Sequence, residues 1–81
     1  MTVVRYANGD QVRIGDIVDV NEGKGPWMRV VVIIPSSEAA DGFDPAHWSY
    51  LKKGIVLQDT KVFGLLHLDE LDHGQVLVQR A

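Results

Sequence analysis

The chain has 81 residues, a length that one hydrophobic core accommodates, so we expect a single domain spanning residues 1–81. It contains no cysteine, which excludes a disulfide framework, a thiolate metal site and a cysteine nucleophile. Eleven acidic and eight basic residues give a net charge of −3, and the basic residues are scattered, which disfavours nucleic-acid binding.

The apolar runs of the chain are too short for a membrane segment. The longest, residues 30–34, has five residues, whereas spanning a bilayer takes about 18 or more. Residues 1–6 lack the long apolar core of a signal peptide. We therefore expect a soluble, cytoplasmic protein that makes no contact with a membrane.

The start of the chain reads as three short strands. Residues 3–6 are rich in β-branched and aromatic side chains, and the following Asn8-Gly9 is the dipeptide that best tolerates a tight hairpin turn. Residues 11–14 alternate polar and apolar side chains, so we expect them to return antiparallel to the first strand. In residues 17–20 the same alternation places Asp19 on the face away from the valines.

Residues 21–26 combine glycine, proline and charge, which predicts a turn. A phosphate-binding loop is the alternative reading of the two glycines, but no Walker-type Lys-Ser/Thr pair and no helix follows.

Residues 27–34 are the strongest strand signal, because their density of β-branched side chains opposes a helix. Such an apolar strand is usually central in its sheet or covered on both faces. Alternation predicts an inward and an outward set: Met28, Val30, Val32 and Ile34 inward, and Arg29, Val31 and Ile33 outward. We expect Trp27, at the start of the strand, to be partly exposed and to be a candidate binding anchor.

Residues 36–45 are the longest connection in the chain. Glu38, Asp41 and Asp44 lie in it, but they lack the alternating carboxylates and the distal glutamate of a calcium loop, so a solvated loop is the preferred interpretation.

A helical turn follows this loop. Asp44 suits the N-cap and Pro45 the first helical position, so we predict a short helical turn over residues 45–53 that is stopped by Gly54. We expect its apolar and aromatic side chains to plug one end of the fold rather than to form a peptide groove: Trp48, Tyr50 and Leu51.

The end of the chain reads as strands at residues 55–58, 62–68 and 75–79, with an acidic loop at residues 69–74. Gly64 interrupts the second of these strands, which predicts a bulge, a tight bend or the close approach of an aromatic ring.

Short strands, frequent turn signals and one helical turn describe an all-β fold. We predict a small SH3-like barrel or roll of about five to six antiparallel strands, with one short helical turn near residues 45–53. Residues 6–18 and the pattern Trp48-x-Tyr50-Leu51-x-x-Gly54 with Gly64-Leu65-x-His67 resemble a group of small bacterial SH3-like proteins. Some members of this group look like immunity proteins that are paired with secreted antibacterial toxins. Their binding surfaces differ with each toxin, so the resemblance identifies no binding residue here.

His67, Asp69 and His73 superficially resemble a metal site, because imidazole and carboxylate groups bind zinc. A strand would place His67 and Asp69 on one face, but His73 lies beyond a loop, so hydrogen-bonded or exposed histidines are the preferred interpretation. We predict no metal and no cofactor. Because side chains fill the interior of a small barrel and no Ser/His/Asp arrangement is present, we also predict no enzyme and no catalytic residue.

These observations predict a protein-binding module, in its most specific form an immunity-type inhibitor that neutralises a bacterial toxin by direct binding. Acidic loops would steer association with a basic cleft on the partner. The candidate partner-binding residues lie in the two acidic loops and at the start of the central strand: Asp41, Phe43, Asp44, Asp69, Glu70, Asp72 and Trp27.

Two alternatives remain open at this point. The first is a nucleic-acid-associated SH3-like module that binds through scattered cations: Arg5, Arg13, Arg29 and Lys61. The second is a structural homo-oligomer formed through exposed edge strands, so we expect either a monomer or a small homo-oligomer.

Overall fold

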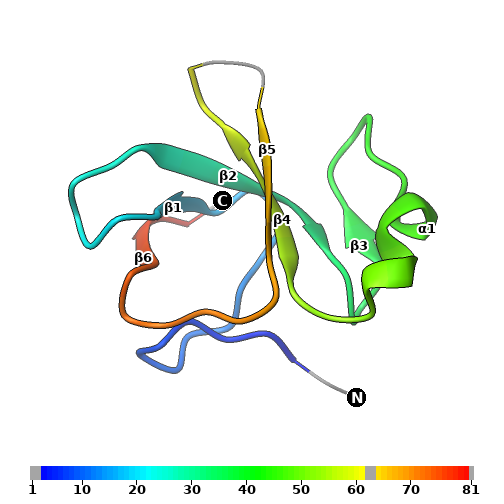
Figure 1. Ribbon diagram of the computed structural model, residues 1–81, viewed down its shortest axis with the longest axis horizontal. Coiled ribbons are helices and arrows are strands. Elements are labelled where there is room, and N and C mark those ends of the chain that lie inside the picture. Colours follow the sequence, from blue (N-terminus) through cyan, green and yellow to red (C-terminus); the bar gives the residue numbers. More distant parts are fainter. Residues whose placement is uncertain (1–2, 62–63, 81) are drawn as a thin grey trace.

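Antiparallel strands and one short helical segment make up the fold (Figure 1). The computed structural model describes residues 3–61 and 64–80. Its six strands form one sheet in the order β5-β4-β2-β1-β6, with β3 also paired to β2. The strands are β1 (Ile17–Asp19), β2 (Trp27–Ile33), β3 (Glu38–Ala39), β4 (Ile55–Asp59), β5 (Leu65–Leu68) and β6 (Val76–Gln79). The predicted small all-β roll is confirmed.

Strand β2 is central, as its apolar sequence predicted, and it pairs with β1, β3 and β4. Its register against β4 shifts between Val30 and Val32, so Val31 is an extra residue on one strand. The predicted alternation is therefore wrong beyond Val30, because Ile33 returns to the face of Val30 while Val32 turns to the other face with Ile34.

The sheet separates the core into two clusters, one on each of its faces. The larger cluster contains Tyr6, Val12, Val18, Met28, Val30, Ile33, Ile55 and Leu57. The smaller one contains Val31, Val32, Ile34 and Val56. Burial on both faces explains why β2 and the start of β4 carry almost no polar side chains.

The start of the chain forms a tight turn rather than the two predicted strands. Arg5 and Gln11 form one isolated antiparallel bridge, and Gly9, at a φ of 95°, donates its N–H to the carbonyl of Tyr6 at 2.9 Å. The predicted turn at Asn8-Gly9 is confirmed, but this hairpin is too short for a ladder.

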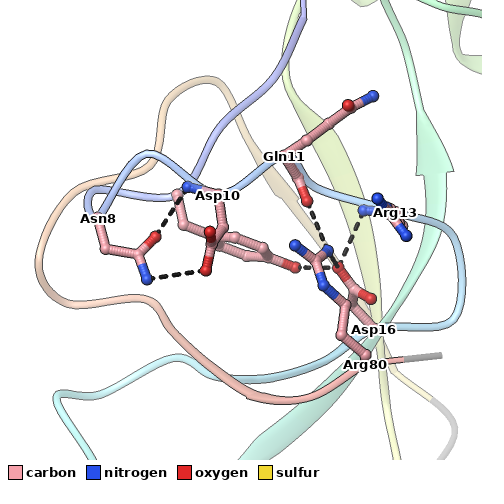
Figure 2. Close-up of polar contacts among 7 residues, drawn as sticks. Asn8, Asp10, Gln11, Arg13, Asp16 and Arg80 are labelled. Atoms are coloured by element: carbon pink, nitrogen blue, oxygen red, sulfur yellow. Dashed lines mark hydrogen bonds and ion pairs between the residues drawn. The ribbon is translucent and has the colours of Figure 1, made fainter.

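A buried carboxylate fastens this hairpin to the rest of the fold (Figure 2). Asp16 is fully buried, and its Oδ2 accepts from the Tyr6 hydroxyl at 2.7 Å, from the backbone N–H of Arg13 at 2.9 Å and from Arg80 Nη1 at 3.0 Å. The same Arg80 nitrogen donates to the carbonyl of Gln11 at 2.6 Å. Burial first, then the hydrogen bond with Asp16, raises the pKa of Tyr6 above its ordinary value.

The predicted helical turn consists of α1 (Pro45–Trp48) followed by a 3₁₀ turn (Ser49–Leu51). Asp44 is the N-cap, as predicted, and its Oδ1 accepts from the N–H of Ala46 at 2.9 Å. Trp48 and Leu51 pack against the smaller cluster, whereas Tyr50 is 71% exposed. The prediction that all three side chains plug the fold is thus wrong for Tyr50, because the tight turn directs it outward.

Further differences concern the 36–45 connection and the glycines. Part of that connection, predicted as a loop, forms β3 beside β2.

The predicted close approach at Gly64 is absent, because a Cβ on Gly64 would meet no neighbouring atom. The close approach occurs at Gly54, which has a φ of 93° and lies against the carbonyl of Leu68. Residues 62 and 63 of the predicted strand 62–68 lie outside the described residues. No helix in the described part of the chain is long and apolar enough to cross a membrane.

Candidate functional site

One carboxylate organises the loop between β1 and β2. Asp19 ends β1 and is 1% exposed; its Oδ1 accepts from the N–H groups of Asn21 at 2.9 Å and Gly23 at 3.0 Å, and its Oδ2 from Gly25 at 2.8 Å. The loop can wrap around the carboxylate because Gly23 and Gly25 adopt φ values of 92° and 74°, which glycine reaches at little cost. Although Asp19 is charged, the loop that follows it buries its carboxylate.

The hydrogen bonds to Asp19 favour its charged form and occupy the amides of the loop. The N–H of Asn21 lowers the pKa of this carboxyl most, and the N–H groups of Gly23 and Gly25 and the side chain of Trp27 lower it further, against the opposing effect of burial. Because these glycine amides already donate to Asp19, they are not oriented to cradle a phosphate. The predicted turn at residues 21–26 is confirmed.

Trp27 lies beside this loop and is 52% exposed, in agreement with the prediction of a partly exposed side chain. It is the antiparallel partner of Asp19 in the β1–β2 pair. An open cleft of about 610 Å³ extends along it, lined by residues 23–27 on one side and residues 59–61 on the other. In Figure 1 the loop that carries the first wall projects at the left, in cyan.

Hydrogen bonds join the two walls of the cleft. Thr60 donates to the backbone carbonyl of Trp27, from Oγ1 at 3.1 Å and from its N–H at 3.4 Å. Within the second wall, Asp59 Oδ1 accepts from the N–H of Lys61 at 2.7 Å. Hydrogen bonds between and within the walls hold the shape of the cleft, so a ligand would meet a preformed site.

Chemically, the cleft combines an exposed apolar surface with two cations. Trp27 and Pro26 are exposed, and so are Lys24 and Lys61. Trp27 was predicted as an anchor, but the contribution of Lys24 and Lys61 to the same cleft was not. Their proximity depends on the β2–β4 pairing, and no local sequence pattern reports it.

The first group of predicted contact residues lies between β3 and α1, at the right of Figure 1. Asp41 is exposed, Phe43 packs partly buried against the smaller cluster, and Asp44 caps α1.

The second group lies between β5 and β6, along the bottom of Figure 1. Asp69 Oδ1 is 3.4 Å from His67 Nε2, Glu70 Oε1 is 3.7 Å from Lys53 Nζ, and Asp72 Oδ1 accepts from the N–H of Gly74. At the end of this second group, the carbonyl of Gly74 accepts from the N–H of Glu22 in the loop between β1 and β2 at 3.0 Å. The second group therefore adjoins the loop that leads to Trp27, whereas the first lies beside β3 and α1. The role of both groups in binding a partner stays a prediction.

The two histidines of the predicted metal site, His67 and His73, lie in different surroundings. His67 Nε2 is 3.1 Å from the carbonyl of Lys53 as well as near Asp69, while His73 lines a different hollow, beside Tyr6. Within residues 3–61 and 64–80, no group of three or more His, Cys, Asp or Glu side chains could hold a metal ion.

Comparison of the chain with protein-family models, with curated proteins and with solved structures found no match. The resemblance to small bacterial SH3-like proteins thus stays a prediction.

Proposed function

We propose that this chain is a protein-binding module and that Trp27 is its anchor. The observation that carries the proposal is the half-exposed indole of Trp27 beside a preformed cleft. Tryptophan is among the residue types that most often dominate binding energy at protein interfaces, because it buries a large rigid surface at a small entropic cost. The exposed Pro26 beside it extends the apolar surface that a partner would cover.

In its most specific form, the proposal is an immunity-type inhibitor that neutralises a bacterial toxin by direct binding. The resemblance described above supports this form, and so do the exposed carboxylates of the 69–74 segment, which would speed association with a basic toxin surface. In this arrangement the acidic segments steer the encounter and the Trp27 cleft holds the complex.

The test is co-expression with the product of the neighbouring open reading frame, followed by gel filtration. We expect that product to be toxic alone and to co-elute with this chain. Trp27→Ala should abolish the complex, whereas Tyr50→Ala, which removes an even more exposed aromatic ring away from the cleft, should leave it intact. A harmless neighbour, or the absence of a complex, would remove the support for an immunity function.

Exposed apolar side chains on two edge strands support a second candidate, a structural homo-oligomer. Among the described strands, β5 pairs only with β4 and β6 only with β1, and both carry side chains that are 38–45% exposed: Leu65, Leu66, Val76 and Val78. Unpaired strand edges of this kind can join two copies. Light scattering across a range of protein concentrations decides the question, because a constant monomer mass would exclude this candidate.

A further inference from the structure

The charge of the Trp27 cleft is opposite to that of the chain. The chain has a net charge of −3, yet the two exposed charged side chains that line the cleft are Lys24 and Lys61. The third charged lining residue, Asp59, is only partly exposed and accepts a hydrogen bond from the backbone of its own turn. Neither lysine forms an ion pair with any residue in the described part of the chain.

The way the loop is built decides how an anion would be bound there. The N–H groups of Gly23 and Gly25 point at Asp19, and that of Lys24 donates to the carbonyl of Asn21 at 2.9 Å. The loop N–H groups are therefore not oriented to bind a phosphate in this cleft. The negative charge of a ligand would instead contact the ammonium groups of the lysines, which lie at the ends of flexible side chains. Such groups act as point charges and suit carboxylates spaced along an extended chain.

The apolar part of the cleft sets a second requirement for a ligand, an apolar group. Trp27 and Pro26 offer a rigid apolar surface, and the volume of about 610 Å³ suits a few side chains rather than a folded element. Filling it with an apolar group releases water from the indole, while the lysines on the two walls favour carboxylates on either side of that group.

We infer that the Trp27 cleft binds an acidic peptide segment, an extended stretch of the partner in which a large apolar side chain is flanked by Asp or Glu. This inference rests on the proposed protein-binding function and names the chemistry of one segment of the partner, a different part from the basic surface that the 69–74 carboxylates would meet. A single-stranded nucleic acid is the less suitable occupant, because it requires a track of cations and several stacking rings, whereas one exposed tryptophan and two lysines line this cleft.

The test begins with a library of random linear peptides displayed on phage and selected against the wild-type protein, with the Trp27→Ala variant used to remove other binders. We expect the enriched sequences to share an aromatic or large aliphatic residue with acidic neighbours. Enrichment of basic peptides would overturn the inference and leave the protein-binding function standing. A selection without any Trp27-dependent peptide would overturn the inference, while the co-elution experiment above decides the proposed function independently.

Calorimetry with the enriched peptide then tests each part of the cleft. The double variant Lys24→Gln/Lys61→Gln should weaken binding about tenfold and reduce its dependence on salt, because each exposed charge pair contributes modestly. Matched replacement of Lys52 and Lys53, exposed lysines outside the cleft, should change little. Oligothymidine serves as the nucleic-acid probe, and Trp27-dependent binding to it that is tighter than binding to the peptide would overturn the inference.

Discussion

Replacing Tyr6 by Phe tests the buried network that joins the two ends of the described chain. The substitution keeps the ring in the core and removes the hydroxyl that donates to Asp16 at 2.7 Å. A hydrogen bond to a charged group contributes about 1.5–3 kcal/mol, so we expect the free energy of unfolding at neutral pH to fall by about 2 kcal/mol. For a domain of this size that corresponds to a decrease in Tm of about 10 °C, which thermal and urea unfolding followed by circular dichroism will measure.

The dependence of stability on pH gives a sharper test of the same network. In the unfolded chain Tyr6 ionises near a pKa of about 10, whereas in the folded protein burial and Asp16 raise its pKa. Its contribution to stability is therefore fully present below about pH 10 and is lost as the pH rises further, by up to about 1.4 kcal/mol per pH unit. At about pH 11 the wild-type protein should have lost about 1.4 kcal/mol that the Tyr6→Phe variant does not lose.

The matched control is Tyr50→Phe, which removes the same hydroxyl from a side chain that is 71% exposed and should change stability little. The difference in stability between wild type and Tyr6→Phe should narrow between about pH 9 and 11, while the difference for Tyr50→Phe stays small and constant. If the difference for Tyr6→Phe were also constant, Tyr6 would ionise as readily in the fold as in the unfolded chain, and the reasoning about the buried network would be refuted.

Two further predictions concern backbone geometry and the loop of the cleft. Gly54→Ala should destabilise the protein by more than about 2 kcal/mol in urea unfolding, because the positive φ is strained for alanine and the new Cβ meets a β5 carbonyl. Gly64→Ala is its control and should change stability by no more than about 0.5 kcal/mol; equal effects would contradict the geometric argument. Because hydrogen bonds lower the pKa of Asp19, its contribution is present above the ordinary carboxyl pKa and is lost only as the pH falls through the lower folded-state value. The NMR signal of the Gly25 amide should therefore stay in place down to about pH 4, and a shift that follows an ordinary carboxyl titration would show that the loop is not held as described.

Much of the fold follows from local patterns in the sequence. The β-branched run of residues 27–34 requires a central strand, Asn8-Gly9 a tight turn, and Asp44-Pro45 the start of a helical turn; all three appear where they were predicted. These signals are reliable because their causes lie within a few residues: side-chain crowding at χ1, access to positive φ, and the unpaired N–H groups of a helix start.

The register of β2 could not be predicted in this way. Alternation reports which way successive side chains face only while the strand stays regular, and one extra residue at Val31 reverses it. That irregularity arises in the pairing of β2 with β4, and the alternation of side chains along β2 carries no information about this pairing.

The candidate site likewise combines local features that could be predicted with long-range contacts that could not. The sequence by itself determined that residues 21–26 turn and that Trp27, at a strand start, is partly exposed. Only the tertiary structure decided that Thr60, 33 positions away, holds the second wall of the cleft against Trp27 and that Arg80, 64 positions away, neutralises the buried Asp16. The physical reason is that burying a carboxylate or shaping a cleft depends on partners that chain topology brings together, whereas composition and periodicity describe only each residue and its neighbours.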